Sequence, residues 1–192
     1  MTSPVSAPGR SPALIPAVRL RPAAFLDRDG VLNQDLGYAY QVADFHWLPG
    51  AVQACKRLQD AGYALVVVTN QSGVARGLYT LADVDLLHTH MQRELAAAGV
   101  SLTAVYACPH HPEARVEAYR IDCNCRKPRP GLLLQAIREQ SLDPARSVLI
   151  GDKTSDLQAG AAAGVPRCFL VGAGQALPDL AAAVNQLLGS PA

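Results

Sequence analysis

Two aspartates lie two residues apart, directly after a short apolar run. Asp27 and Asp29 follow residues 23–26 and precede Gly30. Parallel strands present functional side chains at their carboxyl ends, so we expect both carboxylates in one crevice. Like charges this close repel one another unless a cation or a shared proton relieves them, and Mg²⁺ prefers carboxylate oxygens together with a substrate phosphate. The pair therefore indicates a magnesium-dependent phosphoryl site, although an acidic, solvated turn has the same local pattern.

Three more polar residues follow in an order that suggests one shared site. Thr69 ends the apolar run at residues 65–68, and Asp152 ends a similar run at 148–150. Lys127 lies between them, just ahead of a helical segment. Taken singly, Thr69 could be a strand-end turn residue and Lys127 a solvated loop charge. The ordered set of paired acids, threonine, lysine and acid instead favours groups delivered to the same edge of a sheet.

This order resembles the haloacid dehalogenase superfamily of phosphohydrolases, from about residue 23 to residue 172. Within it, the motifs are most similar to the branch that acts on heptose bisphosphates. The strings that carry this likeness are residues 27–30, 35–38, 69–73, 108–112 and 123–128. The resemblance implies a phosphatase for a small sugar bisphosphate, active in making the heptose of bacterial cell-surface glycans.

The resemblance also implies a role for each residue of the ordered set. Asp27 would be the nucleophile that forms an aspartyl-phosphate. Asp29 would be the general acid for the departing sugar oxygen and then the general base for water. Asp152 would join Asp27 and the backbone carbonyl of Asp29 around Mg²⁺. Lys127 and Thr69 would stabilise the phosphoryl group in transfer.

Substrate recognition is assigned by the same resemblance. Arg126 looks like the family's recognition arginine, and a guanidinium suits bidentate contact with phosphate or sugar oxygens. The other residues expected to line the substrate are Asp35, Gly37, Tyr38, Asn70, Gln71, Ser72 and Lys153. Asp156 has two interpretations: it could support the magnesium site or cap its own helix.

A cysteine-rich loop gives a second strong signal. Cys108 and His110 are separated by 12 residues from Cys123 and Cys125, and four soft ligands of this kind suit a tetrahedral structural zinc. His111 is the alternative to His110, and a disulfide or plain buried thiols are the alternatives to a metal. The zinc loop of the similar family has the same pattern and implies Zn²⁺. The other two cysteines, Cys55 and Cys168, lie in apolar segments typical of core positions.

The composition sets limits on the class of protein. With 192 residues, 49% of them hydrophobic, the chain can form one domain with its own core. A net charge of +1 argues against nucleic acid as a partner, and no apolar run has membrane-spanning length. Residues 1–22 hold five of the 14 prolines and are expected to form a flexible tail ahead of a domain at 23–192. We expect a cytoplasmic monomer whose thiols stay reduced.

Strand and helix patterns alternate along the domain. The expected strands are residues 23–26, 64–68, 104–107, 147–151 and 167–171, and the expected helices are 51–61, 80–98, 130–140 and 155–163. This alternation predicts an α/β fold with a doubly wound parallel sheet. The intervals between motifs leave no room for a large cap domain, so the site should be open. An aromatic flap at 33–48 and the cysteine loop would be its only cover.

Two rival functions remain open. Histidinol-phosphate phosphatase resembles the chain in the same motifs and also has a zinc loop, but its loop is shorter and residues 35–38 fit the heptose branch better. A zinc-stabilised binding module without catalysis belongs to another class. The presence of all five residues of the ordered set, from Asp27 to Asp152, argues against it.

Overall fold

The computed structural model describes residues 20–190 and contains a five-stranded parallel sheet with the order β3-β2-β1-β4-β5. The strands are β1 (Ala23–Leu26), β2 (Ala64–Asn70), β3 (Leu102–Cys108), β4 (Val148–Gly151) and β5 (Arg167–Leu170). The chain runs outward from β1 to β3 and then returns to place β4 on the other side of β1. The carboxyl ends of β1 and β4 therefore flank the point where ligands bind in open α/β sheets. The predicted doubly wound parallel sheet is confirmed.

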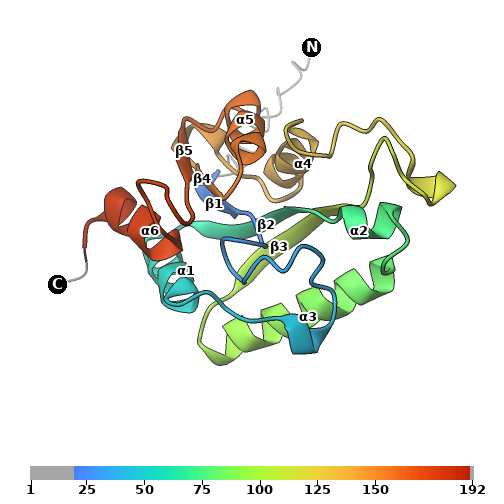
Figure 1. Cartoon of the computed structure of the whole chain (residues 1–192). Coiled ribbons are helices and arrows are strands. Elements are labelled where there is room, and N and C mark those ends of the chain that lie inside the picture. The colour runs from blue at the N-terminus through green and yellow to red at the C-terminus, as the bar shows by residue number, and fades with distance from the viewer. Residues whose placement is uncertain (1–19, 191–192) are drawn as a thin grey trace, which may run out of the picture.

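Helices cover both faces of this sheet, as Figure 1 shows. The α-helices are α1 (Ala51–Asp60), α2 (Ser72–Ala75), α3 (Leu81–Ala97), α4 (Gly131–Glu139), α5 (Thr154–Ala162) and α6 (Leu180–Leu188), and the short 3-10 helices are η1 (Val42–Asp44), η2 (Glu117–Tyr119) and η3 (Pro144–Arg146). Helices α1, α3 and α6 lie on one face, and α4 and α5 lie on the other. No large cap domain is present in this part of the chain.

Strand alternation decides which face each side chain joins. Leu26 of β1 packs with Leu87 and Met91 of α3 in one apolar cluster. Its neighbour Phe25 packs with Leu133 of α4 in the other. Because both clusters are fully buried, β1 has little freedom to shift along its neighbours: a slip of one residue would exchange the two faces. The end of β1, where Asp27 begins, is therefore fixed by packing.

Two helices lie outside the predicted set. The single-turn α2 directly follows β2, and α6 follows the last strand, where Leu180 and Val184 pack into the cluster beneath β1. The carboxylate of Asp179 accepts a hydrogen bond from the Ala182 amide at 2.8 Å, which is an N-cap. An acid ahead of an alanine- and leucine-rich stretch was the available signal for α6.

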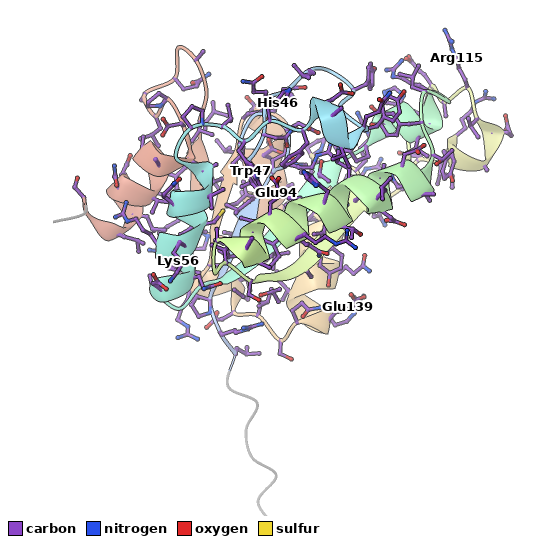
Figure 2. The ribbon with its side chains drawn as sticks, turned by 90° about the horizontal axis from the view of Figure 1, so that it is seen from below. His46, Trp47, Lys56, Glu94, Arg115 and Glu139 are labelled. Atoms are coloured by element: carbon purple, nitrogen blue, oxygen red, sulfur yellow. The ribbon has the colours of Figure 1, made fainter. Side chains whose placement is uncertain are left out.

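Two aromatic rings of the segment at residues 33–48 pack against the core instead of covering the site. Phe45 is buried in the core beneath the sheet, and Trp47 packs edge-to-face against it with ring centroids 4.9 Å apart. The Trp47 indole donates a hydrogen bond to Glu94 of α3 (Figure 2). The expected aromatic flap is therefore wrong for these two rings, which anchor the segment to α3 because their apolar surface is buried there.

The domain begins earlier than the sequence suggested. Residues 1–19 of the expected tail lie outside the described residues. Arg21, also assigned to the tail, accepts a hydrogen bond from the Asp143 amide at 2.9 Å, and Pro22 accepts one from the Ala64 amide at 2.9 Å. Arg21 and Pro22 are therefore hydrogen-bonded to the loop before η3 and to the start of β2. Among the helices of residues 20–190, none has both the length and the apolarity to cross a membrane.

Candidate active site

Four segments bring their polar side chains to the carboxyl edge of the sheet. Asp27 and Asp29 follow β1, Thr69 lies near the end of β2, and Asp152 follows β4. Lys127 reaches the same place from the loop that precedes α4. The structure thus brings together all five residues of the ordered set. They come from positions up to 125 residues apart in the sequence.

A buried lysine forms the centre of this group. Lys127 is 4% exposed, and its Nζ lies 2.9 Å from Asp27 Oδ1 and 2.6 Å from Asp156 Oδ1. It also donates to the Val68 carbonyl at 2.8 Å. Burial favours the neutral amine, but the two carboxylates outweigh it and raise the pKa of Lys127. The group therefore remains a cation at neutral pH, and it is held by three acceptors.

Asn70 holds the backbone of that lysine. Its side-chain Nδ2 donates to the Lys127 carbonyl and its Oδ1 accepts from the Lys127 amide, both at 3.1 Å. The expectation for Asn70 was contact with the substrate. The structure places it at the cleft edge, with both ends of its amide joined to Lys127, so it also fixes the lysine.

The neighbouring carboxylates meet the requirements of a cation site. One oxygen each of Asp27, Asp152 and Asp156 lies within 4.8 Å of the others. Asp152 Oδ1 is buried and has no hydrogen-bond partner among residues 20–190. Burial, together with the Asp27 charge, raises the pKa of Asp152 to about 6. Its other oxygen, Oδ2, lies 3.4 Å from Lys153 Nζ. A crowded carboxylate with one unpartnered, buried oxygen fits a hard divalent cation such as Mg²⁺.

The structure shows the partners of both carboxylate oxygens of Asp156, for which the sequence left two interpretations. One carboxylate oxygen pairs with Lys127, and the other accepts from the Lys153 amide at 2.9 Å at the start of α5. Both interpretations therefore apply: the residue caps its helix and supports the lysine. Sequence reasoning could find the cap but not the ion pair, because the partners come from different segments.

Asp29 is held by donors that sequence reasoning missed. Arg28 Nη2 lies 2.9 Å from Asp29 Oδ2, and Asn33 Nδ2 donates to Asp29 Oδ1 at 2.9 Å. Arg28 is fully buried and also donates to His88 Nε2 on α3 at 3.2 Å. Burial, with Arg28 adding to it, lowers the pKa of His88 to about 3. His88 therefore stays neutral and can accept that bond.

A cleft of about 520 Å³ opens above these groups. Its lining residues are Asp29, Asp35, Gly37, Tyr38, Asn70, Ser72, Arg126, Lys127, Pro128, Lys153 and Ser155. Lys153 Nζ lies 3.2 Å from Asp35 Oδ2 across one side. Of the residues expected to line a substrate, Gln71 is absent from this lining: its side chain is buried beneath the cleft. Basic and acidic side chains therefore line this cleft together.

The cysteine loop forms a compact cluster beside the cleft. Cys125 Sγ lies 3.1 Å from Cys108 Sγ and 3.1 Å from Cys123 Sγ, and His110 Nδ1 lies 3.3 Å from Cys125 Sγ. His111 is turned elsewhere, with its Nδ1 accepting from the Glu113 amide at 3.1 Å. Sulfur ligands about 2.3 Å from a tetrahedral zinc lie roughly 3.8 Å apart. Cys108 Sγ, at 3.6 Å from Cys123 Sγ and 3.8 Å from His110 Nδ1, is close to that spacing, and the other pairs are somewhat tighter. The four residues therefore fit one Zn²⁺, with His110 and not His111 in the set.

The loop also sets the approach to Lys127. Gly131 donates its amide to the Asn124 carbonyl at 2.9 Å, and a Cβ at Gly131 would lie 2.3 Å from that oxygen. On the other side, the amides of Arg115 and Val116 both donate to the Ala75 carbonyl of α2. Arg115 itself points outward at the end of the loop (Figure 2). The loop is thus held at both ends, and Arg126 and Lys127 follow directly from Cys125.

Comparisons with known proteins agree with this site. A family model described as HAD-hydrolase-like matches residues 124–187. A relative from Yersinia pestis, named D-glycero-beta-D-manno-heptose-1,7-bisphosphate 7-phosphatase, is 46% identical over 154 residues, which cover 80% of this chain and 82% of the relative. A relative from Photorhabdus laumondii subsp. laumondii, named D-glycero-alpha-D-manno-heptose-1,7-bisphosphate 7-phosphatase, is 42% identical over 151 residues, which cover 79% of this chain and 82% of the relative.

A solved structure is similar over most of the fold. It is that of D,D-heptose 1,7-bisphosphate phosphatase from B. bronchiseptica complexed with magnesium and phosphate. The TM-score is 0.75 and the sequence identity is 38%, and the match covers 87% of this chain and 98% of the other.

We predict that Gly30→Ala weakens magnesium binding. Gly30 has φ +81°, and an added Cβ would lie 2.5 Å from Asp152 Oδ2, so the carboxylate must move. Disturbing the surroundings of a ligand typically costs roughly 10–100-fold in metal affinity, which calorimetric titration with Mg²⁺ would measure. Gly62→Ala is the matched control, because Gly62 has φ +88° and open space around its Cβ position. Equal Mg²⁺ affinity in both variants would contradict the assignment of Asp152.

We also predict one zinc per chain in protein purified under reducing conditions. The double variant Cys123→Ser, Cys125→Ser should lose it while keeping its far-ultraviolet circular dichroism, because the sheet has two apolar clusters of its own. Elemental analysis gives the metal content. Cys168→Ser is the control: Cys168 lies outside the cluster, so this variant should keep its zinc. Zinc retained by the double variant would rule out this ligand set.

Proposed function

The chain belongs to the D-glycero-D-manno-heptose-1,7-bisphosphate 7-phosphatase family of haloacid dehalogenase-like hydrolases, and from that premise we propose that it removes the 7-phosphate of D-glycero-D-manno-heptose 1,7-bisphosphate. The observation that carries this proposal is the buried Lys127 between Asp27 and Asp156, beside Asp152, one of whose carboxylate oxygens has no hydrogen-bond partner among the described residues. A fixed cation next to a carboxylate nucleophile suits phosphoryl transfer, in which positioning and charge stabilisation dominate catalysis.

Four residues of the ordered set have a role in the two steps of this mechanism. The Asp27 carboxylate attacks phosphorus, forming a bond from its oxygen to phosphorus while the bond to the sugar oxygen breaks. That oxygen leaves as an alcohol after taking a proton from Asp29. Water, which gives a proton to Asp29, then attacks the aspartyl-phosphate, releasing phosphate and restoring Asp27. Lys127 and Thr69 stabilise the charge on the phosphoryl oxygens.

The two metals have separate places. Asp27, Asp152 and the backbone carbonyl of Asp29 would hold Mg²⁺, which supplies positive charge next to the phosphoryl group. Cys108, His110, Cys123 and Cys125 would hold Zn²⁺, which stabilises the loop ahead of Lys127. The magnesium named in the B. bronchiseptica complex supports the first assignment.

The cleft has basic lining groups that suit the rest of the sugar bisphosphate. Arg126 and Lys153 both line it, and their cationic groups can contact the second phosphate and sugar oxygens. Binding energy gained there can position the reacting phosphate and so raise turnover. Asp35, Tyr38 and the other lining residues would contact the sugar.

We further propose that the protein works as a monomer in the cytoplasm, in the synthesis of heptose precursors for cell-surface glycans. None of the five cysteines, all of which lie in the described part of the chain, is in a disulfide, and thiols of this kind persist in a reducing compartment. The site is complete within one chain, which supports a monomer.

A substrate panel tests the proposed function. Phosphate release should be fastest with the heptose 1,7-bisphosphate, offered as both anomers, and slower with histidinol phosphate and fructose 1,6-bisphosphate, compared as kcat/KM. Asp27→Asn should abolish release from every substrate because the nucleophile is lost. A preference for histidinol phosphate would favour the rival family, and absence of turnover with both metals bound would favour a binding module.

Arg126→Ala should affect the bisphosphate selectively. Loss of a charge-assisted contact costs about 1.5–3 kcal/mol, or roughly tenfold to a hundredfold in kcat/KM. The kcat/KM for the small ester glycerol 3-phosphate should fall much less, because this substrate has no second phosphate. Arg138→Ala, at an exposed position on α4, is the control. Equal losses on both substrates would show that Arg126 serves the reacting phosphate.

A further inference from the structure

Gln71 is buried beneath the cleft and contacts two catalytic groups at once. It is 2% exposed. Its Nε2 donates to Thr69 Oγ1 at 2.9 Å and to Asp29 Oδ2 at 3.1 Å. These are the groups that the proposed function assigns to phosphoryl stabilisation and to proton transfer. A single side-chain amide therefore joins them.

The neighbouring charges fix the orientation of this amide. If its ends were exchanged, Oε1 would face the Asp29 carboxylate at the distance now spanned by a hydrogen bond, and two acceptors would repel one another. With Nε2 toward Asp29, Oε1 faces the Tyr79 hydroxyl, which donates to it at 2.8 Å. Both protons of the amide nitrogen are then used, one on Thr69 and one on Asp29.

Tyr79 is itself placed by packing. Its ring lies against Gly73, where an added Cβ would come within 2.1 Å of ring carbon Cε1. It also stacks on Tyr40, with ring centroids 5.1 Å apart and planes at 14°. Burial raises the pKa of Tyr79 to about 12, so its hydroxyl keeps the proton that it donates. The acceptor end of Gln71 thus has a fixed partner.

This arrangement decides what the Thr69 hydroxyl can do. A threonine hydroxyl has one proton to donate and can accept from others. Because Gln71 donates to Oγ1, the hydroxyl proton is not used on Gln71 and remains for another acceptor. At this edge of the sheet, a phosphoryl oxygen is such an acceptor. An isosteric residue without the amide would leave the hydroxyl free to turn away.

We propose that Gln71 is a positioning residue that orients the Thr69 hydroxyl toward the transferring phosphoryl group and holds Asp29 at a fixed distance from it, instead of contacting the sugar. The proposal rests on the roles given to Thr69 and Asp29 under the proposed function. It differs from the expectation that Gln71 lines the substrate, because the side chain lies below the cleft and both of its polar atoms are bonded within the protein.

The test compares two substrates that share the reacting phosphate but differ in size. Gln71→Met keeps the length of the side chain and removes its donor and acceptor. Its kcat should fall about tenfold to a hundredfold on both the heptose bisphosphate and glycerol 3-phosphate, somewhat less than the ~10²–10³ typical of a direct donor, with KM changed less than about threefold. A loss confined to the heptose bisphosphate, or to KM, would show that Gln71 contacts the sugar and would overturn the proposal.

Two further variants keep the result interpretable. Gln71→Asn retains an amide at the buried position but is too short to reach both partners, so we expect the same loss of kcat. It replaces Gln71→Met in the test if that variant folds poorly. Gln59→Met is the matched control. The Gln59 side chain donates to the Gly99 carbonyl and accepts from the Ser101 amide, far from the cleft. Replacing it with methionine should therefore leave kcat unchanged. Full activity in both Gln71 variants would overturn the proposal.

A binding measurement separates this proposal from the choice of substrate. Orthovanadate with Mg²⁺ can adopt the five-coordinate geometry of phosphoryl transfer, whereas inorganic phosphate cannot. Calorimetry should show Gln71→Met weakening vanadate binding at least tenfold and phosphate binding less than threefold. If the wild type hydrolyses glycerol 3-phosphate but not the heptose bisphosphate, the substrate assignment fails. Comparing wild type and Gln71→Met on glycerol 3-phosphate and on the two anions still tests the positioning role. Equal weakening of both anions would contradict the positioning role.

Discussion

The burial of one lysine is the constraint on which the rest of the site depends. An ammonium group 4% exposed is costly unless paired and hydrogen-bonded, and Lys127 is stabilised by two carboxylates and a carbonyl. Removing Lys127 would leave the buried carboxylates of Asp27 and Asp156 without the cation they share, which is strongly destabilising. The same pairing places a cation beside Asp27. Stability and chemistry therefore require the same contacts.

The requirement extends outward to the elements that hold Lys127 and Asp29 in place. The Lys127 backbone is held by Asn70, and the loop before it is held by the Cys108–Cys125 cluster and by the close approach of Gly131 to Asn124. On the other side of Asp27, the buried Arg28 connects Asp29 to His88 of α3. A zinc in the cysteine cluster would thus act on catalysis through the position of one lysine.

The parts of the fold that could be predicted are those with local signals. Strand ends are visible as apolar runs that stop at polar residues, so Asp27, Thr69 and Asp152 could be placed together, and the cysteine spacing indicated a metal. Contacts made by distant partners gave no such signal. The pairing of Asp156 with Lys127, the Arg28 contact with His88 and the burial of Gln71 depend on how α3, α5 and the loops pack. The prediction that Phe45 and Trp47 cover the site was wrong for the same reason. An aromatic residue in a segment without regular periodicity can either cover a site or pack into the core, and the local sequence does not distinguish the two.

The central claim is that Asp27 receives the phosphoryl group within the contacts of Lys127 and Thr69. A crystal structure of the full chain with Mg²⁺ and beryllofluoride, which mimics an acyl-phosphate, tests it most directly. We expect beryllium bonded to Asp27, with fluorides contacted by Lys127 Nζ and the Thr69 hydroxyl and with Asp152 on the magnesium. Beryllofluoride bonded to another carboxylate, or a lysine turned away from it, would contradict the account.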